Sequence, residues 1–387
     1  MPVNINDLLK LALDRRASDL HLKVGNHPIV RVDGHLVPLE EHSKLTQEDA
    51  VNIAFSLMTT AQKEKFKQKN ELDLAHSAPG MGRFRVNVFQ QRGTVGLVFR
   101  VVPTKIMTIE ELNLPPVLEK LATEQRGLIL VTGTTGSGKT TALAAMIDYI
   151  NRNRMDNIIT VEDPIEFLHR DRKCIVSQRE VGADTDSFNT ALRSALRQDP
   201  DVILVGEMRD FETIQTALVA AETGHLVMST LHTLDAAETV NRIISVFPPY
   251  QQKQVRMQLA SVLRGIVSMR LVPKADNTGR VPAVEVLIAT QTIREAIIDP
   301  DKTRKISEVI AAGQSQYGMQ TFDQSLLDLF KKKLVTYEEA LRWCSNPDDF
   351  TLKVKGIQST SDSWSIQSGA TPDPGADSKF KVERFGK

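Results

Sequence analysis

A glycine-rich turn between an apolar run and a helix-forming segment constrains this chain more than any other stretch of its sequence. Residues 127–140 read Gly-Leu-Ile-Leu-Val-Thr-Gly-Thr-Thr-Gly-Ser-Gly-Lys-Thr. The run 128–131 carries no charge and is β-branched at its end, which predicts a strand buried on both faces. Residues 140–147 lack glycine and proline and favour a helix. The turn between them lets successive backbone N–H groups point at an anion near the positive end of that helix.

This stretch matches the Gly-x-x-x-x-Gly-Lys-Ser/Thr pattern of a P-loop, in the strand-turn-helix context that the pattern requires. We expect Lys139 to reach the β and γ phosphates of a nucleotide and Thr140 to offer its hydroxyl to Mg²⁺. A glycine-rich turn that matches by chance is the alternative, and the flanking strand and helix argue against it. The predicted nucleotide-binding residues of the loop are Gly133, Thr134, Thr135, Gly136, Ser137, Gly138, Lys139, Thr140 and Thr141.

Composition excludes several classes of protein. With 387 residues, 41% of them apolar, the chain is long enough for two soluble globular domains. A formal net charge of zero does not favour nucleic acid or an anionic membrane as a bulk partner. Cys174 and Cys344 are too few and too far apart for a disulfide framework or a zinc site, which fits a reducing cytoplasm. No apolar stretch approaches the ~20 residues that span a bilayer, and we expect a cytosolic protein.

The first hundred residues alternate between helical and strand patterns and predict an α+β unit. Its expected elements are helices over 4–16, 47–57 and 61–69, a hairpin over 18–39 that turns at Asp33-Gly34, and strands over 82–89 and 95–101. The strand over 82–89 alternates at period two, so Arg83 and Arg85 share one face while Phe84 and Val86 share the other.

The rest of the chain predicts a second unit with a mainly parallel sheet covered on both faces, because strands alternate with helices. A proline-containing connection over 102–126 precedes it, holds a helix over 117–122 and offers a hinge. Beyond residue 236 the pattern is mostly helical, interrupted by a strand over 281–288. Residues 356–387 are rich in Ser, Asp, Gly and Pro and are predicted to be disordered. The alternating elements are strands over 128–131, 157–161, 201–205 and 225–230 and helices over 187–197 and 211–222.

Acidic residues and a histidine follow three of these strands. Glu207 ends the segment 202–207, Glu162 and Asp163 follow 158–161 together with Glu166, and His232 follows the last strand. Each of these alone is more often a solvated carboxylate or a satisfied histidine than a catalytic group. Three at the carboxyl ends of strands, where open α/β sheets bind their ligands, favour a functional site. Glu207 is expected to help hold the Mg²⁺ shell.

Four segments, in this order and spacing, resemble the Walker A, Asp box, Walker B and His box of secretion ATPases. They cover residues 133–140, 160–167, 196–210 and 223–233. Residues 17–22, 82–87 and 318–323 are similar to the PilT-like type IV pilus retraction ATPases of that superfamily, and the similarity covers about residues 1–350.

The resemblance implies a homohexameric motor that hydrolyses ATP with Mg²⁺ to drive pilus retraction and twitching motility. It implies a PAS-like α+β N-terminal domain followed by a RecA-like P-loop domain with a helical C-terminal part. The implied boundaries are 1–101, a linker over 102–113, an ATPase domain over 114–355 and a tail over 356–387. The implied partners are the inner-membrane platform protein of the pilus machine and a second retraction ATPase, at the cytoplasmic side of the inner membrane.

The same resemblance implies a role for individual residues. Glu162 matches the general base of the Asp box, and Glu207 matches the Walker B carboxylate. His225 and His232 match the His-box pair. The family's N-terminal arginines, which contact nucleotide phosphates, match Arg83, Arg85 and Arg100. Composition alone would favour a solvent-facing strand edge for the first two arginines.

One segment departs from the retraction ATPases. Residues 292–299 read Thr-Ile-Arg-Glu-Ala-Ile-Ile-Asp, where the family carries Ala-Ile-Arg-Asn-Leu-Ile-Arg-Glu. Two alternatives therefore stay open: a pilus-extension or type II secretion ATPase, and an accessory nucleotide-gated protein with little hydrolysis. An extension or type II secretion ATPase usually carries an extra N-terminal domain and a four-cysteine zinc module. The given sequence starts almost directly at the Ser-Asp-Leu-His segment and has two cysteines, which favours a retraction ATPase. The presence of Glu162 and Glu207 argues against the accessory protein.

Overall fold

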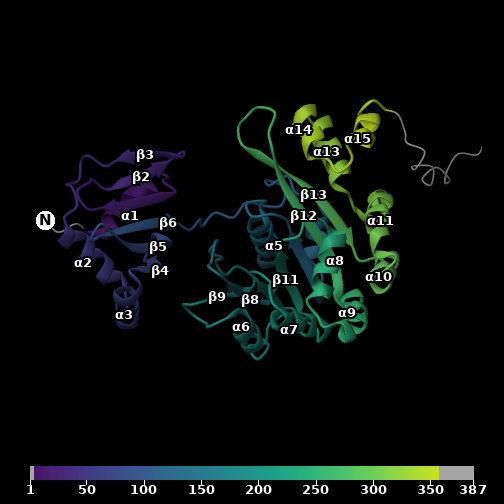
Figure 1. The fold of residues 1–387 in the computed structure, drawn as a ribbon, viewed down its shortest axis with the longest axis horizontal. Helices are drawn as coiled ribbons and strands as arrows, with labels where there is room; N and C mark the ends of the chain where they lie inside the picture. Colours follow the sequence, from purple (N-terminus) through teal and green to yellow (C-terminus); the bar gives the residue numbers. More distant parts are fainter. Residues whose placement is uncertain (1–3, 357–387) are drawn as a thin grey trace, which may run out of the picture.

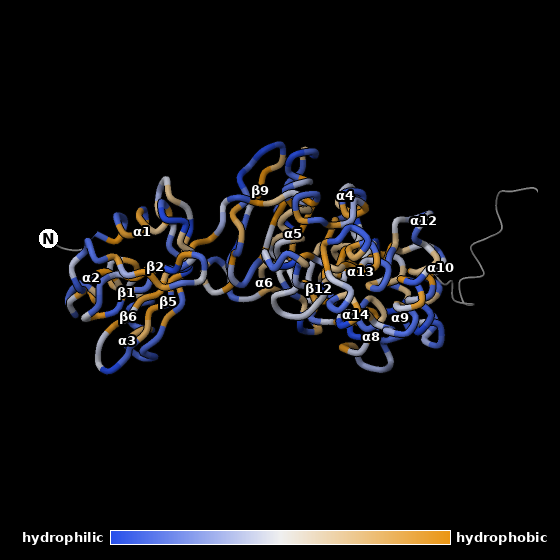
Figure 2. The backbone as a smooth tube through the Cα atoms, turned by 90° about the horizontal axis from the view of Figure 1, so that it is seen from above, coloured by the Kyte–Doolittle hydropathy of each residue, from blue (hydrophilic) through white to orange (hydrophobic). Residues whose placement is uncertain are grey.

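The computed structural model describes residues 4–356. It contains two β-sheets, and the segment that follows β6 connects them (Figure 1). Figure 2, seen from above, shows the same two parts side by side, with α1 and α2 in one and α8 and α9 in the other. Apart from Gly356, the predicted tail lies outside the described residues. Within residues 4–356, no helix is both long enough and apolar enough to cross a membrane.

The N-terminal sheet consists of six antiparallel strands in the spatial order β3-β2-β1-β6-β5-β4. Its strands are β1 (Asp19–Lys23), β2 (Ile29–Val32), β3 (His35–Pro38), β4 (Glu71–Ala78), β5 (Gly82–Gln91) and β6 (Thr94–Val101). Three helices pack on it: α1 (Ile5–Asp14), α2 (Gln47–Leu57) and α3 (Thr60–Lys69). The helices and one face of the sheet form a single core, in which Leu9, Val88 and Phe99 are fully buried.

Local sequence signals set the ends of these elements. Thr46 and Thr59 each begin a helix with a capping box, in which two backbone N–H groups at the helix start find side-chain acceptors. Asp33 and Gly34 adopt φ values of 48° and 84° in the turn between β2 and β3, a conformation that glycine favours. The predicted hairpin turn is confirmed.

The two-faced character predicted for β5 is also confirmed. Phe84 and Val86 are each 1% exposed and belong to the core. Arg83 and Arg85 lie on the opposite face and are partly exposed. Period-two alternation therefore separates the apolar and the basic side chains of this strand, as a sheet with one covered face requires.

The C-terminal sheet has seven strands in the order β13-β12-β7-β11-β10-β8-β9. Its strands are β7 (Gly127–Thr132), β8 (Asn157–Glu162), β9 (Ile175–Glu180), β10 (Val202–Val205), β11 (Leu226–Leu231), β12 (Leu263–Pro273) and β13 (Arg280–Ile288). All neighbours pair in parallel except β13, which runs antiparallel to β12. The predicted α/β class and the mainly parallel sheet are confirmed.

Helices cover both faces of this sheet, as predicted. Leu128 and Leu130 of β7 pack into one apolar cluster, and Ile129 and Val131 of the same strand pack into another on the opposite face. The covering helices are α4 (Val117–Ala122), α5 (Lys139–Asn153), α6 (Phe188–Ala195), α7 (Phe211–Glu222), α8 (Ala236–Ser245) and α9 (Pro249–Val262).

The C-terminal part is largely helical. Its elements are α10 (Gln291–Ile298), a 3-10 turn η1 (Thr303–Lys305), α11 (Ile306–Ala312), α12 (Gln314–Tyr317), α13 (Phe322–Lys331), α14 (Tyr337–Trp343) and α15 (Pro347–Val354). Helices α13 to α15 lie beside the far end of the β12–β13 hairpin (Figure 1). They share with it a separate apolar cluster that includes Val272, Phe322 and Phe350.

Three strands were not predicted from the sequence: β4, β9 and β12. The expectation of a mostly helical segment beyond residue 236 is wrong at β12, which follows α9 without a glycine or proline between them. Strand β9 lies at the sheet edge and carries a polar run from Ser177 to Arg179, so its apolar pattern is weak. In each case the neighbouring strand supplies the hydrogen bonds that local propensity does not reveal.

Candidate functional site

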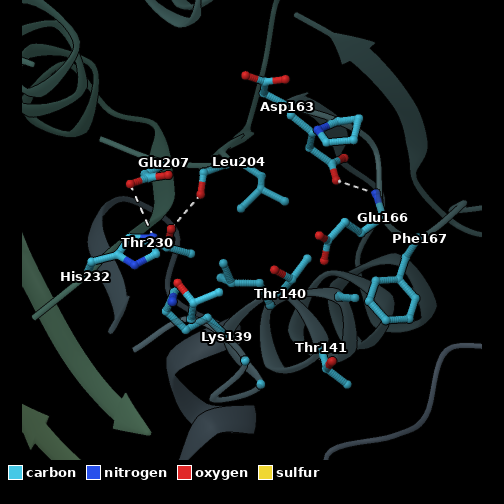
Figure 3. A pocket seen from close by; sticks show the side chains of 18 of the residues that line it. Lys139, Thr140, Thr141, Asp163, Glu166, Phe167, Leu204, Glu207, Thr230 and His232 are labelled. Atoms are coloured by element: carbon cyan, nitrogen blue, oxygen red, sulfur yellow. Dashed lines mark hydrogen bonds and ion pairs between the residues drawn. The ribbon is translucent and has the colours of Figure 1, made fainter. Parts of the chain in front are cut away.

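A cavity of about 660 Å³ lies where the carboxyl ends of β7, β8, β10 and β11 meet (Figure 3). Neighbouring parallel strands end at one edge of the sheet, so segments far apart in sequence converge there. Figure 3 shows Glu207 and His232 on one side of the cavity and Glu166 on the other. The P-loop residues that line it are Thr135, Gly136, Gly138, Lys139, Thr140 and Thr141, and the predicted strand-end residues are Glu162, Asp163, Glu166, Glu207 and His232.

The P-loop needs glycine at Gly133, the first residue after β7. Its φ is 142°, which L side chains rarely adopt, and an added Cβ would lie 2.5 Å from Met269 O and from Ser137 Oγ. Ser137 is 3% exposed, and its hydroxyl has no hydrogen-bond partner among the described residues. The backbone is therefore packed tightly against β12 at the point where it turns toward the cavity.

Lys139, the first residue of α5, folds back over this loop. It is 8% exposed, and its Nζ donates to Gly133 O at 2.9 Å and to Thr134 O at 3.0 Å. Burial lowers the pKa of Lys139, whereas the carboxylates of Glu207 and Glu166 raise it. The cation thus lies inside the loop with two carboxylates near it, in a position to exchange the carbonyls for phosphate oxygens.

Glu162 ends β8 and is 7% exposed. Its Oε1 accepts hydrogen bonds from Thr160 Oγ1 at 2.7 Å and from Gln178 Nε2 at 3.1 Å. Its Oε2 is 3.5 Å from Glu166 N. Burial raises the pKa of Glu162, and the hydrogen bonds from Thr160 and Gln178 oppose that shift. A buried carboxylate with a raised pKa, close to a phosphate-binding loop, is suited to accept a proton from water.

Glu207 lies between two basic side chains. Its Oε1 is 2.5 Å from Arg209 Nε and 3.3 Å from His232 Nε2. Thr230 Oγ1 donates to Gly206 O at 2.7 Å and so ties β11 to the segment that carries Glu207. The carboxylate is therefore oriented by contacts from its own loop and from the neighbouring strand.

The donor set fits a magnesium ion. Thr140 and Glu207, the predicted ligands, line the same cavity and offer a hydroxyl and a carboxylate oxygen. Mg²⁺ prefers such hard oxygen donors and commonly takes one or two carboxylates together with substrate phosphates.

Two of the predicted N-terminal arginines, Arg83 and Arg85, do not line the cavity but are held beside it. Arg83 Nη2 lies 3.0 Å from Glu180 Oε2, and this oxygen also accepts a hydrogen bond from Ile165 N at 3.2 Å. Arg85 Nη1 lies 3.9 Å from Glu166 Oε1, which does belong to the cavity wall. These ion pairs bring the basic face of β5 against the end of β9 and the loop that follows β8.

Two predicted residues lie elsewhere. Arg100 Nε lies 3.0 Å from Asp19 Oδ1, within the N-terminal sheet. His225 precedes β11 at the amino end of that strand, and its Nδ1 is 2.9 Å from Ala220 O. Because the cavity is at the carboxyl ends of the strands, the structure does not bring His225 to it, whereas His232 lies at the correct end.

Sequence reasoning missed several residues of the cavity wall. Arg209 lies two positions after Glu207 and could have been found from that proximity. Burial lowers the pKa of His169 to about 4, so its imidazole is neutral at pH 7. Arg280 belongs to β13, and only the tertiary pairing of β13 with β12 brings it here. The missed residues include Phe167, His169, Arg209, Thr230, Leu271 and Arg280.

Comparison of the sequence with known proteins gives three findings. A family model described as type II/IV secretion system protein matches residues 2–339. The chain is 45% identical to the type IV pilus retraction ATPase PilT of Pseudomonas aeruginosa, over 90% of this chain and 100% of that protein. It is 43% identical to the type IV pilus ATPase PilU of the same organism, over 92% of each chain.

A solved structure is similar over nearly the same length. The crystal structure of the pilus retraction motor PilT with bound ADP gives a TM-score of 0.82 at 46% identity. The match covers 90% of this chain and 98% of that chain. The similarity therefore includes both sheets and the segment between them.

Proposed function

Because the chain belongs to the type II/IV secretion system protein family, we propose that it is an ATPase that hydrolyses ATP to ADP and phosphate and drives type IV pilus retraction. Membership of this family confirms the resemblance predicted from the four motif segments. The observation that carries the proposal is the convergence of Lys139, Glu162 and Glu207 on one cavity beside a P-loop. The similarity to a PilT structure with bound ADP supports the choice of nucleotide.

The proposed mechanism assigns each group a separate task. Lys139 and the loop N–H groups bind the β and γ phosphates. Thr140 and Glu207 would hold Mg²⁺, which would supply positive charge to neutralise the transferring phosphoryl group. Glu162 accepts the proton of the attacking water. His232, which contacts Glu207, keeps that carboxylate oriented.

The proposal extends to assembly and movement. We infer a homohexamer in which an N-terminal domain over residues 1–101 moves against an ATPase domain over 114–355 about a linker over 102–113. Arg83 contacts Glu180 at the end of β9, and Arg85 contacts Glu166 in the loop after β8, which supports their transfer to the phosphates when the domains close. The proposed location is the cytoplasmic base of the pilus machine, with the inner-membrane platform protein and a second retraction ATPase as partners.

The similarity to PilU favours a second candidate function, that of a companion to another retraction ATPase. Pilus number and twitching in a deletion strain separate the candidates. If the protein is a main retraction ATPase, the deletion strain should carry many pili and show no twitching. If it is an extension ATPase, the strain should carry no pili. If it is a companion, the strain should only twitch more weakly.

Two substitutions test the proposed chemistry in the full-length protein. Lys139→Ala should abolish ATP binding because it removes the phosphate-binding cation, whereas Glu162→Gln should bind ATP normally and lose turnover. Binding is measured with a fluorescent ATP analogue, and turnover by phosphate release. Equal loss of binding in the two variants would contradict the assignment of Glu162 as a base.

A further inference from the structure

The side chain of Gln178 joins Glu162 to the loop that follows β8. Gln178 is the fourth residue of β9, the edge strand of the C-terminal sheet. Its Nε2 donates to Glu162 Oε1 at 3.1 Å and to Phe167 O at 2.9 Å. Its Oε1 accepts from His169 N at 2.8 Å. One amide group therefore makes three hydrogen bonds to two different segments of the cavity wall.

These bonds make the two oxygens of Glu162 unequal. A carboxylate oxygen has two lone pairs, and Oε1 uses both on Thr160 and Gln178. Oε2 has a contact with Glu166 N at 3.5 Å, which is the outer limit of a hydrogen bond. Oε2 thus keeps the capacity to accept a proton, whereas Oε1 does not.

We propose that Gln178 is a positioning residue for hydrolysis, which holds Oε1 of Glu162 so that Oε2 is the atom that takes the proton from water. The inference rests on the proposed role of Glu162 as general base. A general base must lie within hydrogen-bond reach of the proton that it accepts, and a small displacement of the reacting atoms lowers the rate strongly. Gln178 acts through Glu162 and does not itself line the cavity.

The position requires an amide. Glutamine offers two donors and an acceptor, so it satisfies Glu162, Phe167 O and His169 N at once. An ionised glutamate in its place would be unable to donate and would repel Glu162.

Gln178 is uncharged, so its replacement by alanine leaves the charges around Glu162 unchanged. Loss of its hydrogen bond removes one stabilisation of the ionised carboxylate, and the pKa of Glu162 rises further. The charged or titratable groups that share the cavity with Glu162 are Lys139, Asp163, Glu166, His169, Glu207, Arg209, Asp210, His232 and Arg280.

The test compares Gln178→Ala and Gln178→Glu with wild-type full-length protein. Ser177→Ala is the matched control, because Ser177 is exposed and lies on the other face of the same strand. For both Gln178 variants, we expect ATP affinity to stay within about threefold of wild type and kcat to fall at least about tenfold. The acidic limb of the plot of kcat against pH should move to higher pH. Gln178→Glu keeps the side-chain size and should move that limb further. Ser177→Ala should behave as wild type.

A merely structural role would give a different pattern. It would lower the melting temperature and kcat together and leave the acidic limb of the pH profile unmoved, which would overturn the inference. Wild-type kcat in both Gln178 variants would overturn it as well.

Glu162→Gln, alone and with Gln178→Ala, separates this inference from the proposed function. If Gln178 acts through Glu162, the double variant is no slower than Glu162→Gln. An inactive Glu162→Gln with unaffected Gln178 variants would refute the positioning role and leave the base assignment intact. An active Glu162→Gln would refute both.

Discussion

Replacement of Arg83 by alanine tests whether the N-terminal sheet takes part in hydrolysis. Arg83 and Glu180 form an ion pair at 3.0 Å, with side-chain exposures of 18% and 9%. To stabilise a transferring phosphoryl group, the guanidinium must leave this carboxylate, because it does not line the cavity in the present arrangement. The rate effect of the substitution therefore contains a gain at the phosphate and a cost at Glu180.

The magnitudes of the gain at the phosphate and of the cost at Glu180 follow from general values. A hydrogen bond between charged groups contributes about 1.5–3 kcal/mol, so leaving Glu180 lowers the rate by roughly 10- to 100-fold. An arginine that reaches the transition state raises kcat by about 10³- to 10⁵-fold. The gain exceeds the cost, and we expect Arg83→Ala to lose at least about tenfold in kcat. Glu180→Gln weakens the pair and keeps the arginine, so its kcat should equal or exceed that of wild type.

The assay is phosphate release at saturating ATP and Mg²⁺, with assembly checked by light scattering and ATP affinity by a separate titration. Arg15→Ala is a suitable control, since Arg15 forms an exposed ion pair with Glu41 in the same N-terminal part of the chain. Exposed ion pairs contribute little to the stability of the fold. Wild-type kcat in assembled Arg83→Ala would refute the reasoning. A loss in Glu180→Gln as large as that in Arg83→Ala would show that the pair is structural.

Two further predictions concern the P-loop and a buried carboxyl group. Gly133→Ala should weaken ATP binding at least about tenfold, because its Cβ would meet Met269 O at 2.5 Å, and unchanged affinity in a titration would contradict the packing argument. Burial raises the pKa of Glu285 from 4.5 to about 7, while Ala236 N donates to its Oε1 at 2.9 Å. The folded form therefore loses stability as pH rises from about 4.5 to 7, by at most about 3 kcal/mol. Glu285→Gln keeps the acceptor and should melt higher than wild type at pH 8 but not at pH 4.5, and identical melting at both pH values would disprove this.

The P-loop could be predicted from the sequence because its chemistry is local. The residues from Gly133 to Thr140 are contiguous, and their strand-turn-helix context is visible in the apolar pattern on either side. Glu162 and Glu207 were predictable for a related reason. Each ends a short apolar run, and parallel strands present their carboxyl ends at a common edge, so strand type alone indicates that they converge.

Other features depend on which strands become neighbours, and only the tertiary structure decides that. Gln178 lies on β9, whose polar sequence resembles a loop until β8 pairs with it. Arg280 reaches the cavity because β13 folds back on β12 beside β7. The partner of Arg83 comes from residue 180, in the other sheet. A local pattern encodes the face on which a side chain lies, whereas its partner depends on packing between segments that are distant in sequence.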